Sequence, residues 1–120
     1  MNNNRSLKTV LVDDEPFVRA DLCYLLSRHR QVEVVWETGI FYEAKKIITE
    51  TPLDLVFLDI QLRGGSGFDL IPYINPEITN LIIITAHEKY REKALKTIAL
   101  DFILKPVTPE GLAKAIKQIS

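Results

Sequence analysis

Short hydrophobic runs alternate with amphipathic segments along this chain. Five runs are dominated by aliphatic and aromatic residues: 9–12, 32–38, 55–58, 81–84 and 102–104. Runs of this length are typical of strands, and continuous apolar runs are typical of strands buried on both faces of a sheet. We therefore expect five strands. The run at 32–38 alternates more and carries Glu33, which suits an edge strand.

Apolar residues at helical spacing follow each run and predict five helices. Examples in chain order are Leu22, Ile47, Ile71, Ala94 and Leu112. In the fourth helix, the spacing of Tyr90, Ala94 and Ile98 predicts a continuous helical face that reaches Ile98.

Prolines and hydroxyl side chains predict where several helices begin. Pro16 and Pro109 fit the first turn of the first and last helices, where the missing N–H costs little. Ser66 and Thr108 are expected N-caps of the third and last helices. Pro72 falls beyond the first turn of the third helix, so that helix should be short or kinked.

Strict alternation of strands and helices predicts an α/β fold with a parallel sheet and helices on both faces. Five strands in one domain favour a flavodoxin-like, doubly wound sheet with strand order 2-1-3-4-5. The polar lead at residues 1–6 is expected to be disordered, and residues 7–120 are expected to form the one domain.

Composition excludes several classes of protein. The 120 residues carry a formal net charge of −1, so no overall positive charge favours DNA. The polar first residues do not form a signal peptide, and no apolar run approaches the roughly 20 residues of a membrane span. We therefore expect a cytoplasmic protein without membrane contact. Its single cysteine, Cys23, is predicted to be a buried thiol in the first helix.

Polar residues follow four of the predicted strands at the point where each strand ends. They are Asp13 and Asp14, Asp59, Thr85, and Lys105. In the predicted strand order these ends lie side by side, at the edge where open α/β sheets bind ligands. Three carboxylates in one concavity repel one another unless a cation lies among them, and oxygen ligands alone suit Mg²⁺ or Mn²⁺.

The remaining groups at this edge suit a phosphoryl group. Lys105 supplies a positive charge, Thr85 a hydroxyl donor, and Asp59 a carboxylate able to form an acyl-phosphate. The chain has no G-x-x-x-x-G-K-[ST] loop, so the phosphate must arrive on a donor other than a nucleotide held in such a loop.

The motif set Asp13-Asp14, Asp59, Thr85-Ala86 and Lys105-Pro106 resembles the receiver domain of two-component response regulators over about residues 7–119. By that resemblance Asp59 accepts phosphate from a sensor histidine kinase. The domain would then be a phosphoacceptor that assists its own phosphorylation and dephosphorylation, and not an enzyme in the usual sense.

The resemblance also assigns roles around Asp59. Mg²⁺ would be bound by Asp14, Asp59 and the backbone carbonyl of Gln61, with Asp13 acting through water. The switch residues would be Thr85 and Phe102, the modulators of dephosphorylation Gln61, Ala86 and His87, and the cis peptide bond Lys105–Pro106. Phosphorylation would switch the face formed by the fourth helix, fifth strand and fifth helix. That face would control dimerisation or an output domain.

Within this family, residues 85–90 and 99–106 are similar to regulators with a LytTR-type DNA-binding domain. DNA would be contacted only through such an output domain, which we expect to lie outside this chain. Two positions depart from the family pattern. Arg63 stands where proline is usual, and Phe102 where tyrosine is common.

Other functions on similar folds fit the residues less well. A phosphatase of the haloacid dehalogenase type needs a second aspartate where Gln61 stands, and a cobalamin carrier needs a histidine there. Flavin binding would need a phosphate-cradling loop where Asp13 and Asp14 would repel the phosphate. A receiver-like module that works without phosphate remains an alternative, which failure to bind Mg²⁺ would favour.

Overall fold

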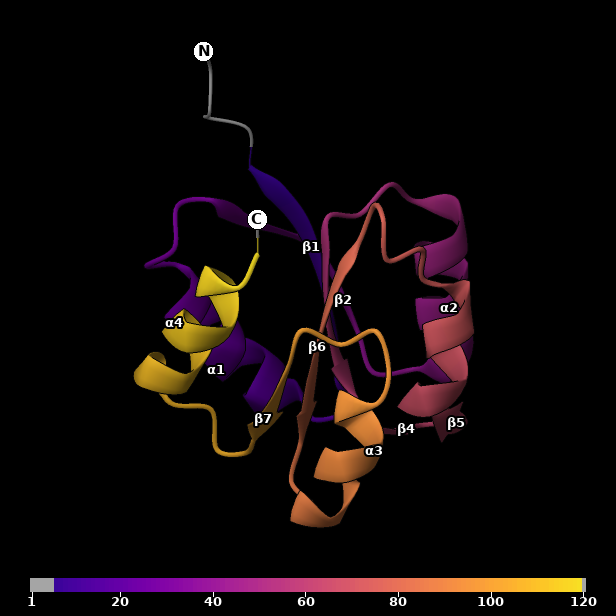
Figure 1. Ribbon diagram of the computed structural model, residues 1–120. Helices are drawn as coiled ribbons and strands as arrows, with labels where there is room; N and C mark the ends of the chain where they lie inside the picture. The colour runs from indigo at the N-terminus through magenta and orange to yellow at the C-terminus, as the bar shows by residue number, and fades with distance from the viewer. Residues whose placement is uncertain (1–5, 120) are drawn as a thin grey trace.

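The computed structural model describes residues 6–119, which fold around one five-stranded parallel sheet (Figure 1). The strands are β1 (Leu7–Val12), β2 (Val32–Thr38), β3 (Leu55–Asp59), β6 (Asn80–Thr85) and β7 (Asp101–Leu104). Their order is β2-β1-β3-β6-β7, with every pair parallel. The predicted fold and strand order 2-1-3-4-5 are confirmed, and β2 is an edge strand as expected.

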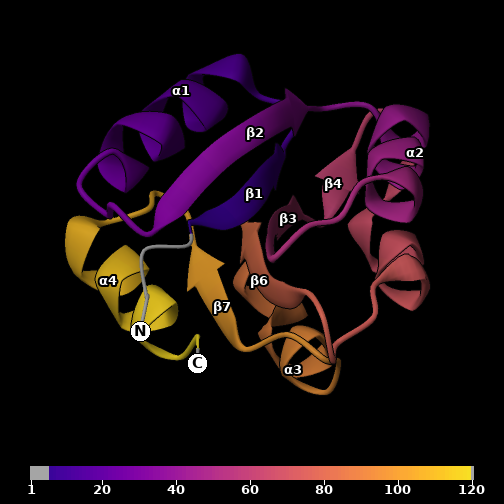
Figure 2. The ribbon, with the colours of Figure 1, turned by 90° about the horizontal axis from the view of Figure 1, so that it is seen from above.

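Helices cover both faces of the sheet (Figure 2). One face is covered by α1 (Pro16–Leu26) and α4 (Pro109–Lys117). The opposite face is covered by α2 (Phe41–Glu50), the 3₁₀ helix η1 (Gly67–Tyr73), and the adjoining η2 (Glu88–Tyr90) and α3 (Arg91–Leu95). No helix among residues 6–119 is long and apolar enough to cross a membrane.

The hydrophobic core is divided by the sheet into two layers. Because side chains alternate along a strand, Val56 and Leu58 of β3 pack toward α2 and η1. Leu55 and Phe57 of the same strand pack toward α1 and α4. All residues of β3 are buried, as the continuous apolar run predicted. β3 is therefore the buried central strand of the sheet.

The predicted helix starts are confirmed. Pro16 and Pro109 lie in the first turns of α1 and α4. Ser66 Oγ accepts a hydrogen bond from the Phe68 N–H, and Thr108 Oγ1 accepts one from the Gly111 N–H. The helix that contains Pro72 is short, as predicted, and is a 3₁₀ helix.

Two local predictions are wrong. The fourth helix does not reach Ile98, because Thr97 Oγ1 donates to the Ala94 carbonyl at 2.6 Å and accepts from the Ala99 N–H. Its side chain thereby ends the helix. Cys23 is only partly buried.

The turn after Asp59 contains a small antiparallel ladder between β4 (Gln61–Leu62) and β5 (Gly65–Ser66), which the sequence did not predict. The ladder is followed by Gly67, whose position allows no side chain because a Cβ there would collide with the Asp59 carbonyl oxygen. The chain therefore returns directly against the end of β3.

Most of the predicted disordered lead lies outside the described residues. Ser6, its last residue, is described, and its Oγ donates to Glu33 Oε1 at 2.8 Å.

Candidate functional site

The carboxyl ends of four neighbouring strands bring the predicted site residues to one edge of the sheet. β3 ends on Asp59 and β6 ends on Thr85, while Asp13 and Lys105 directly follow β1 and β7. Asp13, Asp59 and Thr85 are all buried. The order of the strands thus accounts for the meeting of residues that are far apart in the sequence.

Lys105 lies at the centre of this group. Its Nζ is 2.8 Å from Asp13 Oδ2, 2.9 Å from Asp59 Oδ2 and 2.9 Å from Glu15 Oε1. Only 10% of the Lys105 side chain is exposed, so the ion pairs with Asp13 and Asp59 are shielded from solvent. Lys105 therefore neutralises part of the negative charge of the site.

The backbone at Lys105 is bonded to the end of β6. The Lys105–Pro106 peptide bond is cis. The Lys105 N–H donates to the Thr85 carbonyl at 2.8 Å, which extends the pairing of β6 and β7 by one residue. The start of this loop is therefore fixed to the end of β6.

Burial and the neighbouring charges shift the pKa values of both Asp59 and Lys105. Burial raises the pKa of Asp59 to about 6, and the charge of Asp13 adds to this, whereas bonds from Lys105 and the Gln61 N–H oppose it. Burial alone would lower the pKa of Lys105, but its hydrogen bonds to Asp13, Asp59 and Glu15 raise it overall. Lys105 is therefore positively charged, and Asp59 is a carboxylate whose charge depends on its cationic neighbours.

The carboxylates fit a hard divalent cation. Asp13, Asp14, Glu15 and Asp59 each place one oxygen within 4.8 Å of the others. Mg²⁺ is bound through a few carboxylates together with water and phosphate oxygens, and this donor set holds no nitrogen or sulfur. Glu15 was not predicted from the sequence as a site residue. Its position directly after Asp14 was the available signal, but an acidic residue at the start of a helix is also common without any ligand.

Thr85 offers a hydroxyl group to this site. Its side chain is fully buried, and Oγ1 has no hydrogen-bond partner among the described residues. A buried hydroxyl without a partner costs about 1–3 kcal/mol. This hydroxyl is therefore suited to bind an oxygen atom of a ligand such as a phosphoryl group.

Gln61 and His87 join two loops at the edge of the site. Gln61 Oε1 lies 3.1 Å from His87 Nε2, and both side chains are exposed. The Gln61 N–H also bonds Asp59 Oδ1 at 3.2 Å. Ala86, the third predicted modulator, is exposed beside Thr85.

Phe102 lies in β7, away from the carboxylates. Its side chain is 5% exposed and packs in the core layer on the α2 side of the sheet. The Arg91 guanidinium lies 4.7 Å from the centre of its ring. The ring is therefore turned inward beneath Arg91.

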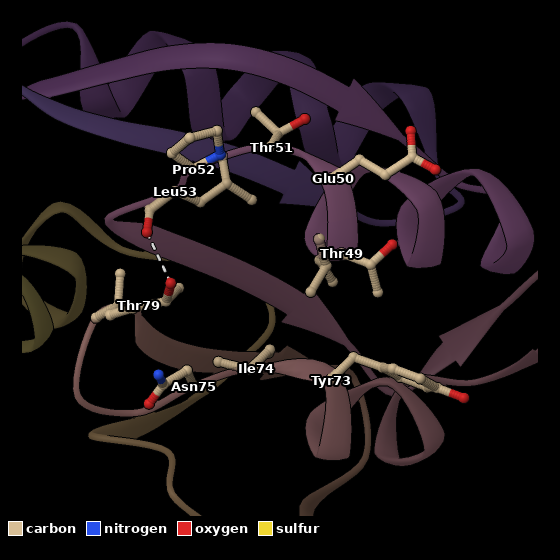
Figure 3. A pocket seen from close by; sticks show the side chains of 11 residues that line it. Thr49, Glu50, Thr51, Pro52, Leu53, Tyr73, Ile74, Asn75 and Thr79 are labelled. Atoms are coloured by element: carbon tan, nitrogen blue, oxygen red, sulfur yellow. Dashed lines mark hydrogen bonds between the residues drawn. The ribbon is translucent and has the colours of Figure 1, made fainter.

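A cavity of about 310 Å³ lies at the opposite end of the sheet, between the end of α2 and the end of η1 (Figure 3). Pro52, Leu53, Ile74 and Tyr73 line it, and Thr79 Oγ1 donates to the Leu53 carbonyl at 2.7 Å beneath it. Among the described residues that line it, Glu50 is the one charged side chain. The cluster of ionisable side chains thus lies at the acidic edge and not in this cavity.

Comparison with known proteins identifies the family of the chain. Residues 9–117 match the family described as the response regulator receiver domain. The chain is 38% identical over 116 residues to the sensory transduction protein LytT of Enterococcus faecalis, covering 95% of this chain and 48% of the relative. It is 37% identical to an uncharacterised response regulatory protein of Vibrio cholerae, covering 94% of this chain and 48% of the relative.

Solved structures show the same fold. The response regulatory domain of protein mrkE from Klebsiella pneumoniae superposes with a TM-score of 0.84 at 25% identity, covering 94% of each chain. A LuxR-family response regulator from Aurantimonas sp. gives a TM-score of 0.82 at 30% identity, covering 95% of this chain and 84% of its own.

The chain spans about half the length of the curated relatives that it matches. The match to the family covers nearly all of the described residues, and LytT and LytR regulators are among the relatives. The chain belongs to the receiver domain family of two-component response regulators.

Proposed function

We propose that Asp59 is the phosphoacceptor of a receiver domain and that a sensor histidine kinase is its phosphodonor. The observation that carries this proposal is the position of the Asp59 carboxylate. It is buried at the end of the central strand, beside a buried lysine and within 4.8 Å of the other acidic oxygens. A carboxylate in this setting is rigidly placed and has cationic stabilisation close by.

In the proposed reaction an Asp59 carboxylate oxygen attacks the phosphorus atom of a phosphohistidine. A P–O bond forms, the P–N bond breaks, and its electron pair returns to the imidazole nitrogen, which takes up a proton from solvent. Lys105 would stabilise charge on the transferring group, and the Thr85 hydroxyl would donate to one of its oxygens.

The reaction would depend on Mg²⁺. Asp14, Asp59 and the Gln61 carbonyl would bind the ion directly and Asp13 would bind it through water, while Glu15 is a further candidate. When bound, the ion would neutralise negative charge on the carboxylates and on the transferring oxygens. The residues of this chain would orient the acceptor oxygen in line with the donor.

The phosphorylated state would be lost by hydrolysis at the same site. The Gln61 N–H bonds Asp59, the Gln61 and His87 side chains are joined by a hydrogen bond, and Ala86 directly precedes His87. We propose that these three positions set the lifetime of the phosphoryl group.

Phosphorylation would be transmitted through Thr85 and Phe102 to the face formed by α3, β7 and α4. Phosphorylation adds nearly two negative charges, and the buried Thr85 hydroxyl would move to bond them. We propose that this face controls a homodimer or an output domain. The similarity to LytT and LytR regulators supports a LytTR-type DNA-binding output in the whole protein.

Intact-mass measurement tests the acceptor. Wild-type protein incubated with acetyl phosphate and Mg²⁺ should gain one phosphoryl group that hydroxylamine removes, and Asp59→Asn should gain none. The same gain in Asp59→Asn would contradict the proposal.

A further inference from the structure

We infer that Arg19 is a positioning residue for the Asp13–Asp14 loop and thereby increases the affinity of the site for Mg²⁺. The inference rests on the proposed function, because it concerns how that metal site is held. Arg19 is the fourth residue of α1, and no role for it was expected from the sequence.

The Arg19 side chain reaches back from α1 to the end of β1. Its Nη1 donates to the backbone carbonyl of Asp13 at 2.6 Å. Its Nε lies 3.4 Å from Glu37 Oε1, at the end of β2. The Arg19 side chain is 22% exposed and that of Glu37 42% exposed, so the guanidinium lies largely beneath the surface. Arg19 therefore joins α1, β2 and the acidic loop.

The loop is already held on its other sides. The Asp13 N–H donates to the Thr38 carbonyl at 2.9 Å, and Asp13 Oδ1 accepts from the Glu15 N–H at 2.9 Å. Gly39 packs so closely against the loop that a Cβ there would lie 2.5 Å from the Asp14 Cα. Arg19 supplies the remaining restraint, on the Asp13 carbonyl.

Without the guanidinium this carbonyl would be open to solvent. A cavity of about 270 Å³ lies beside the loop and is lined by Asp14, Arg19, Glu37, Gly39 and Arg63 among others. Water in place of Arg19 would satisfy the carbonyl oxygen without fixing its direction. Asp13 and Asp14 would then have to be ordered when Mg²⁺ binds.

Arg19 has two opposite effects on the affinity of the site for Mg²⁺, and this makes the inference testable. A nearby positive charge repels the cation, so removing the charge alone would tighten Mg²⁺ binding. Residues that orient metal ligands typically contribute 10- to 100-fold to metal affinity. We expect positioning to outweigh repulsion, because part of the guanidinium charge is neutralised by Glu37.

The experiment is isothermal titration of wild type, Arg19→Met, Arg19→Lys and Arg28→Met with MgCl₂. Arg28→Met is the matched control: it removes one positive charge from an exposed position just beyond the end of α1. Thermal unfolding without Mg²⁺ establishes that each variant is folded. We expect Arg19→Met to bind Mg²⁺ roughly tenfold more weakly than wild type.

The control should bind like wild type. Arg19→Lys retains the charge but not the planar fork of donors, so its affinity should lie between those of wild type and Arg19→Met. Equal or tighter binding by Arg19→Met would overturn the inference. If Arg19→Met does not fold, equal binding by Arg19→Lys and wild type would overturn it. Absence of Mg²⁺ binding in wild type would instead overturn the proposed function, and the role of Arg19 with it.

Discussion

Lys105 Nζ and Asp59 Oδ2 lie 2.9 Å apart although the two residues are separated by 46 positions in the sequence. The same Nζ also contacts Asp13 and Glu15, so one ammonium group partly neutralises three carboxylates. Lys105 therefore supplies, within the protein alone, part of the positive charge that a divalent cation would bring. Four expectations follow from this relationship and from the groups around it.

Asp59→Asn should stabilise the protein without Mg²⁺ at neutral pH. Burial raises the pKa of Asp59 from 3.8 to about 6, so the folded state binds the proton more tightly than the unfolded state. Stability is therefore lost as pH rises from about 4 to 6, and the loss is complete above that range. A shift of this size corresponds to roughly 2–3 kcal/mol at pH 7.5.

Urea unfolding of wild type and Asp59→Asn at pH 7.5 and pH 4 measures this difference. The stabilisation should be largest at pH 7.5 and mostly absent at pH 4. Asp21→Asn, an exposed position on α1, is the control and should show little effect at either pH. A stabilisation that is equal at both pH values would show that burial of the Asp59 charge is not its cause.

Lys105→Met should lower stability and raise Mg²⁺ affinity together. The raised pKa of Lys105 means that its ion pairs stabilise the fold below the unfolded value near 10.5, as long as the partner carboxylates are ionised. Removing one partner of a buried ion pair costs about 3–5 kcal/mol, and the 59% exposure of the third partner, Glu15, places the expected cost near the lower end.

The same change removes a cation from among the Mg²⁺ ligands, so MgCl₂ should raise the melting temperature of Lys105→Met more than that of wild type. The acetyl phosphate reaction should become slower despite the tighter metal binding. Faster phosphorylation of Lys105→Met would contradict the role of Lys105 in stabilising the transferring group.

Thr85→Val should stabilise the unphosphorylated protein and impair its response to phosphorylation. The buried hydroxyl has no partner among the described residues, so its replacement by a methyl group removes a cost of about 1 kcal/mol or more. Thr9→Val is a matched control. Thr9 is also fully buried, but its Oγ1 donates to the Leu7 carbonyl at 2.9 Å.

Chemical unfolding should therefore give opposite signs for the two variants, with Thr85→Val more stable and Thr9→Val less stable than wild type. Sedimentation velocity with and without acetyl phosphate should show that Thr85→Val loses any phosphorylation-dependent association. Destabilisation by Thr85→Val as large as that by Thr9→Val would indicate that the Thr85 hydroxyl already has a partner in the resting protein.

The hydrogen bond between Gln61 and His87 should affect the lifetime of the phosphorylated protein. His87→Ala and Gln61→Ala each remove the same bond, so their effects on the dephosphorylation rate should not add in the double variant. Loss of the phosphoryl mass over time gives the three rates. Additive effects would show that the two side chains act separately.

Most of the fold could be predicted from the sequence because each strand and helix carries its own local pattern of apolar residues. The continuous run that ends at Asp59 predicts a fully buried strand, and the alternation of strands and helices predicts the order of the sheet. That order brings together Asp13, Asp59 and Lys105, whose contacts appear only in the structure.

Other features depended on contacts that no local pattern encodes. α3 ends where the Thr97 side chain forms hydrogen bonds with the backbone of Ala94 and Ala99. The spacing of apolar residues does not reveal such bonds. Glu15 contacts Lys105 only because the carboxyl ends of β1 and β7 lie at the same edge of the sheet. The restraint of Asp13 by Arg19 likewise depends on how α1 packs against β2.

Chemical mapping of the acceptor tests the central claim most directly. Protein treated with acetyl phosphate and Mg²⁺ is reduced with borohydride, which converts an aspartyl phosphate to homoserine, and is then digested for peptide mass spectrometry. We predict homoserine at position 59, dependent on Mg²⁺. Homoserine at Asp13 or Asp14, or at no position after a measured phosphoryl gain, would contradict the assignment of Asp59 as the acceptor.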